Sequence, residues 1–427
     1  MKITMFAIGS TGDVRPYCIL GRELKRRGHE VTIAAFSPFE EMVTQAGLNF
    51  FSIAGDVKDM MSHLMKPGAV GMSYLREAEK AIQNIAPVLL RDLLRAGEGA
   101  EAMLCTFFGT MYYSVAEYYH IPCVQTHYFP MDPNPLMPIS SAPWPHLGAW
   151  WCRLSYRIGY LLISILEKRY LTDWRKQHGM DVRSLRTKPD YSCNGHRIPA
   201  IYATSPLLTP RPDCWDEHIY MSGFWWEEMN EDFTPDEELE RFLQGAEQPV
   251  YIGFGSMVSG DMEDTFRTVT AAVEKSGVRA VIARGWAEGE KPCNTERIHY
   301  VDFVPHDWLF KHVAAAVHHG GAGTTASSLR AGLPTLIVPF GGDQPFWGMR
   351  VHAAGCGPKP VPRDGMTVDQ LAGALKELVS CDAYRKTAAD VGRKLRVEYG
   401  VKTAADIVER EIGAWLESER ASGKRAE

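Results

Sequence analysis

Residues 2–36 read KITMFAIGSTGDVRPYCILGRELKRRGHEVTIAAF, and this stretch decides the fold. Residues 2–8 form a nearly continuous apolar run, which is typical of a strand buried on both faces of a parallel sheet. A small polar turn follows at residues 9–13, and residues 30–36 form a second strand-like run. Two such strands with a helix between them predict a doubly wound α/β sheet.

The predicted helix between these two strands runs from Val14 to Arg27. Pro16 falls in its first turn under this assignment, where the missing N–H is tolerated. Basic residues at the C-terminal end complement the helix dipole, and Gly28 ends the helix.

The chain has 427 residues, which is more than one hydrophobic core usually supports. A second series of strand-like runs begins at residue 249, after a stretch rich in proline and acidic residues. We therefore predict an N-terminal domain over residues 1–225, a linker over 226–248, a C-terminal domain over 249–400, and a final helix over 401–427 that packs back on the N-terminal domain.

Composition argues against several classes of protein. The net charge of −6 disfavours a dedicated nucleic-acid binder, which needs basic patches for phosphates. The nine cysteines are scattered and never spaced C-x-x-C, which disfavours a zinc site or a disulfide framework and suits reduced thiols. No secretory signal and no run long enough to span a membrane is evident, so we expect a cytoplasmic protein, with peripheral membrane contact left open.

The segment VHHGGAGTT, residues 317–325, follows an apolar strand and precedes a predicted helix. Small residues at this turn let backbone N–H groups approach an anion, and the positive end of the helix dipole favours a diphosphate there. His318, Thr324 and Thr325 are further hydrogen-bond donors. The alternative is a tight turn that needs small residues only to pack the helix on the sheet.

Three other turns also follow predicted strands. Asp343 and Gln344 pair an acid with an amide, which suits the hydroxyls of one sugar ring; the alternative is an aspartate that caps the next helix. Residues 303–310 offer backbone and an apolar face to a nucleotide base, with His306 as either a ligand contact or a structural histidine. Residues 253–257 form a small polar loop.

Asp13, in the turn after the first strand, is the candidate general base. The alternative is that it caps the following helix, a common use of aspartate at that position. Capping would lower its pKa and make it a weak base unless its surroundings desolvate it.

Residues 9–17, 304–310, 318–325 and 343–344, in this order, resemble the family-1 glycosyltransferases of GT-B fold. The similarity is to the sterol glucosyltransferase branch, with the glycosyltransferases of glycopeptide-antibiotic biosynthesis nearby. It implies two Rossmann-like doubly wound parallel-sheet domains facing across a cleft. It also implies an inverting reaction without a metal or cofactor, in which the C-terminal domain binds a nucleotide sugar and the N-terminal domain binds the acceptor.

The resemblance also assigns roles to residues. The diphosphate is expected at His318, Gly321, Gly323 and Thr324. Ser10 and Ser256 would touch phosphate or sugar, Val304 and His306 would lie at the base, and Asp343 and Gln344 would hold the sugar. Asp13 corresponds to the base, but the first loop lacks the histidine of the plant small-molecule members. His127, after a predicted strand, is therefore a reserve candidate.

Aromatic residues crowd the N-terminal half, which favours a rigid apolar acceptor with a hydroxyl group, such as a sterol or triterpenoid. UDP-glucose is the expected donor, and TDP-sugars remain an alternative. The aromatic residues meant here are Phe107, Phe108, Tyr112, Tyr113, Tyr118, Tyr119, Tyr128, Phe129, Trp144, Trp150 and Trp151. A transferase of polyketide, flavonoid or glycopeptide products, a nucleotide-sugar epimerase, and a non-catalytic nucleotide-sugar or lipid-binding protein stay open as alternatives. A dinucleotide oxidoreductase is disfavoured, because the first loop lacks the glycine spacing.

Overall fold

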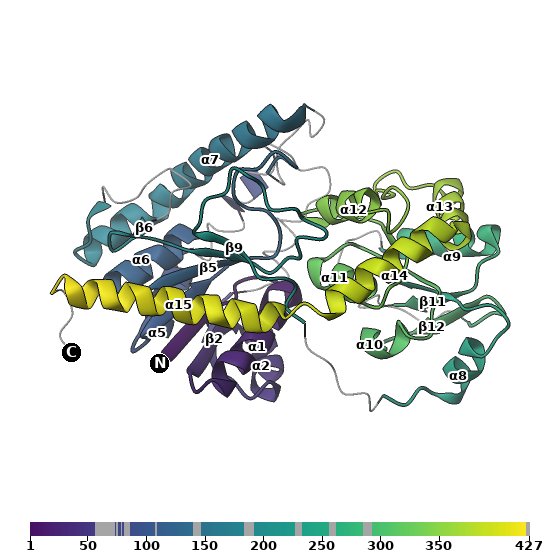
Figure 1. The fold of residues 1–427 in the computed structure, drawn as a ribbon, viewed down its shortest axis with the longest axis horizontal. Helices are drawn as coiled ribbons and strands as arrows, with labels where there is room; N and C mark the ends of the chain where they lie inside the picture. The colour runs from purple at the N-terminus through teal and green to yellow at the C-terminus, as the bar shows by residue number, and fades with distance from the viewer. Residues whose placement is uncertain are drawn as a thin grey trace. The chain divides into compact units, whose positions relative to one another are not determined.

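The computed structural model divides into two compact units, each built on a parallel sheet (Figure 1). The first unit comprises Met1–Pro206, Pro210–Trp225 and Tyr399–Glu427, and the second comprises Leu207–Thr209 and Trp226–Glu398. The structure describes residues 1–55, 73, 76–77, 79–80, 86–106, 109–139, 147–182, 192–226, 233–255, 262–284 and 293–423.

The sheet of the first unit has the strand order β3-β2-β1-β4-β5-β8-β9, and every neighbouring pair is parallel. Ile3 of β1 pairs with Val31 on one side and Ala102 on the other, so β1 lies inside the sheet. The strands are β1 (Lys2–Phe6), β2 (Glu30–Phe36), β3 (Asn49–Ile53), β4 (Ala102–Cys105), β5 (Cys123–His127), β8 (Ala200–Tyr202) and β9 (Ile219–Met221).

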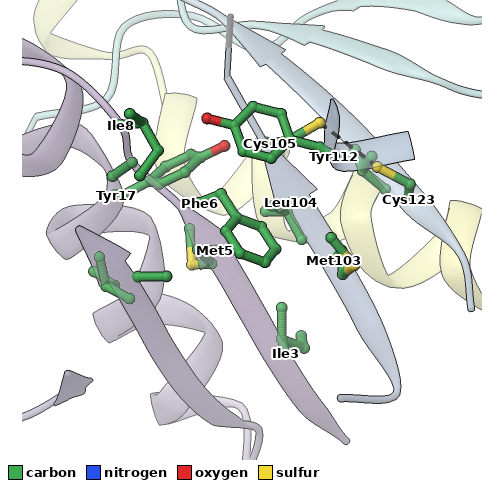
Figure 2. Close-up of a cluster of buried hydrophobic side chains, with 14 of the residues drawn as sticks. Ile3, Met5, Phe6, Ile8, Tyr17, Met103, Leu104, Cys105, Tyr112 and Cys123 are labelled. Atoms are coloured by element: carbon green, nitrogen blue, oxygen red, sulfur yellow. Dashed lines mark hydrogen bonds between the residues drawn. The ribbon is translucent and has the colours of Figure 1, made fainter. Parts of the chain in front are cut away.

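Helices and a small hairpin complete this unit. They are α1 (Thr11–Arg26), η1 (Ser37–Phe39), α2 (Glu40–Gln45), α5 (Ala86–Gly97), α6 (Gly109–Tyr119), α7 (Gly148–Gln177), α15 (Gly400–Ala421) and the antiparallel pair β6 (Ser192–Cys193) and β7 (His196–Arg197). Side chains from β1, β2, β4, α1 and α15 share one buried apolar cluster. Figure 2 shows part of it, where the rings of Phe6 and Tyr112 pack with their centroids 5.3 Å apart.

Helix α1 begins three residues earlier than the sequence predicts. Ser10 is its N-cap, so Thr11 is its first residue and Pro16 lies inside the helix rather than in its first turn. The helix ends at Arg26, one residue before the predicted Arg27. Gly28 follows the C-cap, as expected, with a φ of +92°, a conformation that glycine adopts without a Cβ clash. The early start occurs because Ser10 and Asp13 cap each other reciprocally.

The second unit has the strand order β12-β11-β10-β13-β14, again entirely parallel. Its strands are β10 (Val250–Gly253), β11 (Ala280–Ala283), β12 (Ile298–Val301), β13 (Ala315–His318) and β14 (Thr335–Ile337). Its helices are α8 (Glu237–Leu243), α9 (Met262–Ser276), α10 (His306–Leu309), α11 (Ala322–Arg330), α12 (Gln344–Ala353), α13 (Val368–Ser380) and α14 (Asp382–Arg396). The structure thereby confirms the predicted α/β class with two parallel sheets. Helix α8 falls in the range expected as a linker, and its Leu239 is buried in an apolar cluster of this unit. Within the described ranges, no helix is both long enough and apolar enough to cross a membrane.

Helix α15, at the end of the chain, belongs to the first unit and packs against segments that are far away in sequence (Figure 1, yellow). It packs against α1, where Arg27 Nη1 lies 2.6 Å from Asp406 and 2.8 Å from Glu409. Near its C-terminal end, the carboxylate of Glu419 is 1% exposed. Its Oε2 is hydrogen-bonded to His120 Nε2 at 2.6 Å and its Oε1 to His196 Nε2 at 2.8 Å. One buried carboxylate therefore connects three segments of the unit.

Replacing Glu419 with alanine should destabilise the first unit by about 2–3 kcal/mol, since hydrogen bonds to charged groups contribute roughly that much. Chemical denaturation and hydrogen exchange in α15 would measure the loss. Glu417→Ala is the matched control, because Glu417 is exposed on the same helix. Equal stability of both variants would mean that the hydrogen bonds of Glu419 do not stabilise the packing of α15 on the first unit.

Candidate functional site

In the first unit, the candidate site lies in the turn between β1 and α1. Asp13 Oδ2 accepts hydrogen bonds from the Ser10 backbone N–H at 2.7 Å and from Ser10 Oγ at 3.2 Å. A Cβ on Gly9 would lie 2.2 Å from the same oxygen, so only glycine leaves room for this carboxylate. Ser10 rather than Asp13 is the N-cap, so that part of the capping alternative is wrong; Asp13, the third helical residue, takes part in the cap by accepting from the Ser10 backbone.

Two opposing effects act on the pKa of Asp13. Burial disfavours its charged form, whereas the hydrogen bonds from Ser10 favour it. Burial is the larger effect, and it raises the pKa of Asp13 from 3.8 to about 6 although the side chain keeps some exposed surface. A carboxylate with this pKa is ionised at neutral pH and close to the proton affinity that general-base catalysis needs.

His127, the reserve candidate, ends β5 and is 4% exposed. Its ring lies against Tyr202, with the ring centroids 5.0 Å apart. Burial lowers the pKa of His127 to about 3, because an imidazolium is poorly solvated there. A group that holds its proton so weakly is a poorer base than Asp13, so the electrostatics favour Asp13.

In the second unit, His318 ends β13 and is fully buried. Its Nδ1 accepts from the Gly320 backbone N–H at 3.1 Å, and its Nε2 lies 3.2 Å from Ser328 Oγ. Burial lowers the pKa of His318, so the ring is neutral. In this geometry both ring nitrogens hold the turn together, and donation to a diphosphate would replace the contact with Ser328.

The neighbouring His319 is a residue that the sequence analysis did not single out. Its ring lies beside Gly255 and Gly321, because a Cβ on either glycine would come within 3.2 Å of it. Its Nδ1 is buried and makes no hydrogen bond within the described part of the chain. Burial lowers its pKa to about 4, so His319 is a neutral ring whose hydrogen bonding is incomplete.

The glycines of the segment after β13 fall into two kinds. Gly320 has a φ of +93° and a Cβ there would lie 2.5 Å from Ile337, while a Cβ on Gly321 would lie 2.6 Å from His319. These two glycines are required by packing, as the structural alternative predicts. A Cβ on Gly323 would meet nothing within 4 Å. Gly323 is therefore the position where the chain's own packing gives no reason for glycine.

The N-terminus of α11 has the features of an anion site. Its N-cap is Gly321, and no side chain caps it in the described structure. Ala322, Gly323 and Thr324 form its first turn, where backbone N–H groups have no partner within the helix. Together with the helix dipole, these groups favour a negative charge.

Asp343 and Gln344 begin α12 and use their side chains locally. Asp343 holds the N-cap position without capping the helix, and its Oδ2 accepts from Trp347 Nε1 at 2.9 Å. Gln344 is 4% exposed, and its Oε1 accepts from the backbone N–H of Phe340 at 2.7 Å. Gln344 thus shapes the turn, while Asp343 stays half-buried.

Residues 303–310, after β12, are the segment expected to contact the nucleotide base. Val304 is buried, and His306 stacks on Phe310 with its Nε2 2.9 Å from the Tyr251 hydroxyl. The structural alternative for His306 is therefore satisfied. Phe303 is 71% exposed, and it presents an aromatic face that the sequence analysis did not single out as a contact.

These residues gather at one edge of the second unit's sheet, because parallel strands end on the same side. A Cβ on Gly320 would lie 3.2 Å from the Gln344 carbonyl oxygen, so the turns after β13 and β14 touch. Gly255 likewise brings the turn after β10 to His319. Ser256, Phe107, Phe108 and Trp144 lie outside the described residues.

Of the described aromatic residues proposed for an acceptor pocket, Tyr112 and Tyr113 belong to the core. Trp150, on α7, is 70% exposed instead. Within the described ranges, no three His, Cys, Asp or Glu side chains form a group that could hold a metal ion.

Comparisons with known proteins address both units. The Glycosyltransferase family 28 N-terminal domain matches residues 3–131. The Erythromycin biosynthesis protein CIII-like, C-terminal domain matches residues 290–401. Among solved structures, the calicheamicin glycosyltransferase CalG4 superposes with a TM-score of 0.70 at 18% identity, over 96% of this chain and 98% of that one. At this identity the likeness concerns the fold, which is that of GT-B glycosyltransferases.

Sequence relatives are more specific. Sterol 3-beta-glucosyltransferase UGT80A2 of Arabidopsis thaliana is 32% identical over 95% of this chain and 64% of its own length. UGT80B1 of the same plant is 30% identical over 96% of this chain and 68% of its own. The sterol 3-beta-glucosyltransferase of Yarrowia lipolytica is 32% identical, but this chain spans only 29% of it. The chain belongs to the glycosyltransferase family that includes these sterol 3-beta-glucosyltransferases.

Proposed function

We propose that this protein transfers glucose from UDP-glucose to the hydroxyl group of a sterol, with inversion at the anomeric carbon. The uncapped N-terminus of α11, beside a glycine that packing does not require, carries the proposal. Similarity to sterol 3-beta-glucosyltransferases over nearly the whole chain supports the substrate class.

The donor would bind at the strand ends of the second unit. The first-turn N–H groups of α11 would hold the diphosphate and stabilise the charge that develops as it leaves. The exposed ring of Phe303 offers a stacking face for the base, alongside the backbone at Val304. Asp343 would accept hydrogen bonds from sugar hydroxyls through its half-buried carboxylate.

Asp13 would act as the general base in the first unit. The sterol oxygen attacks the anomeric carbon, the bond from that carbon to the diphosphate oxygen breaks, and UDP leaves with the bonding electrons. The hydroxyl proton passes to Asp13, whose Oδ2 is already oriented by Ser10. The raised pKa of Asp13 makes it a stronger proton acceptor than an ordinary aspartate.

Incubation with UDP-glucose and a panel of sterols, triterpenoids and flavonoids, in a buffer with a metal chelator, should release UDP and add one hexose to the sterols. Mass spectrometry of the products measures this. Tight UDP binding without any product would contradict the transferase function. Product only from TDP-sugars, or only after metal is restored, would contradict the donor or the metal independence.

Asp13→Asn should reduce turnover by about 10²–10⁴-fold, the usual contribution of a general base, and leave UDP affinity unchanged. Asparagine can still accept from the Ser10 N–H, so the helix cap remains. Because the pKa of Asp13 is raised in the folded protein, its ionisation costs stability as pH rises from about 4 to 6. The variant should therefore melt no lower than the wild type at pH 7.

The pH dependence gives a second readout of the same assignment. Wild-type turnover should fall tenfold per pH unit below about 6, as the Asp13 carboxylate takes up a proton. The residual turnover of Asp13→Asn should lack this limb. If the variant keeps wild-type turnover, the base is another residue; if it melts lower at neutral pH, the carboxylate is structural.

Gly323→Ala should separate ligand binding from packing. Its new methyl group meets nothing within 4 Å in the chain, so thermal stability should be equal or higher. If a diphosphate approaches the backbone there, UDP affinity should fall about tenfold or more through loss of a charge-assisted hydrogen bond. Calorimetry with UDP measures the change.

Gly373→Ala is the matched control, since this glycine is also helical and exposed and its Cβ would also meet nothing within 4 Å. It should gain similar stability and keep full UDP affinity. Unchanged UDP affinity in Gly323→Ala would remove the diphosphate from the N-terminus of α11.

A further inference from the structure

Helix α7 carries an apolar stripe on its exposed side. Its members recur at helical spacing, and five of them are more than 40% exposed. The stripe consists of Leu147, Trp150, Leu154, Ile158, Leu161 and Ile165, with Leu147 just before the helix. Soluble proteins seldom expose a contiguous row of this kind without a partner for it.

The opposite side of α7 is buried against its own unit. Cys152, Ser155, Tyr156 and Tyr160 are buried, and Tyr156 and Tyr160 form an apolar cluster with Ile139. The helix therefore does not need the stripe for contact with its own unit. Figure 1 shows α7 as a long rod at the border of the first unit.

The charges beside the stripe indicate what covers it. Arg153 and Arg157 are exposed along one edge, and Lys168 continues that edge one helical turn beyond Ile165. The sequence from Leu147 to Ile165 contains no aspartate or glutamate. This local excess of positive charge stands in a chain whose net charge is −6.

From this arrangement we infer that α7 docks on the surface of an anionic phospholipid bilayer, with its axis along the surface. The apolar side chains would enter the boundary between head groups and acyl chains, with Trp150 at the interface and the arginines on lipid phosphates. Arginine and lysine can extend their charged ends to the head groups while their stems lie along apolar surface.

Two other occupants fit the stripe less well. A symmetric contact between the α7 helices of two copies would bring the arginine edges of both against residues 147–165, which contain no aspartate or glutamate. A small apolar ligand needs a concave site that buries most of its surface, whereas one exposed face of a single helix is convex. A bilayer supplies both the apolar phase and the negative charge.

Vesicle flotation with the full chain tests the inference. The wild type should float with vesicles of phosphatidylcholine and phosphatidylserine, bind far less to phosphatidylcholine alone, and release as salt is raised. The double variant Leu161→Gln, Ile165→Gln should lose at least tenfold in partitioning. The double variant Arg153→Gln, Arg157→Gln should lose the preference for phosphatidylserine.

Val397→Gln is the matched control, because Val397 is 70% exposed and belongs to the second unit, whereas α7 belongs to the first. It should bind vesicles like the wild type. Wild-type failure to float, or equal flotation of the α7 variants, would overturn the inference. So would a wild-type dimer that the glutamine variants dissociate in sedimentation experiments. Glucose transfer to a detergent-dissolved sterol, measured on the same variants, keeps this test separate from the proposed function.

Discussion

Parallel strand pairing is the constraint on which both units depend. Every strand in each main sheet runs in the same direction as its neighbours, so the turns that leave the carboxyl ends must share one edge. This is why Ser10 and Asp13, after β1, lie on the same edge as His127, which ends β5. It also brings the turns after β10, β13 and β14 into contact around His319 and Gly320. The candidate site residues lie at these edges because the turns that follow the strands are there.

At Asp13 the sequence allowed two opposite expectations for one carboxylate. A capping role lowers a carboxyl pKa, and burial raises it. The structure contains both effects, since Asp13 completes a capping box with Ser10 and is nevertheless densely surrounded by protein. Burial prevails, and the pKa rises to about 6. The same residue can therefore stabilise the start of α1 and remain a competent base, so the two readings do not compete.

The strands were predictable because each is a short apolar run ended by a turn, as at Lys2–Phe6 or Ala315–His318. The turn segments were also predictable, since glycines that follow an apolar run mark a turn. The hydrogen-bond partners of the side chains within those turns could not be predicted. Nothing local in the sequence says that Gln344 bonds to the backbone of Phe340. Nor does it say that His319, rather than His318, has a ring nitrogen without a hydrogen-bond partner among the described residues. Those facts depend on contacts between segments that are distant in sequence or on side-chain direction at a strand end.

The segment after β13 therefore contains two kinds of residue. Some build the turn: Gly320 and Gly321 avoid clashes, and His318 ties the backbone to Ser328. Loss of any of these would disturb the fold and ligand binding together, so a weakened variant would not distinguish the two. Others have no internal reason for their identity, such as Gly323, whose Cβ would meet empty space. Because the packing of the chain does not require glycine there, a change in ligand affinity on substitution can be assigned to the ligand contact itself, and such positions give the clearest test of the ligand.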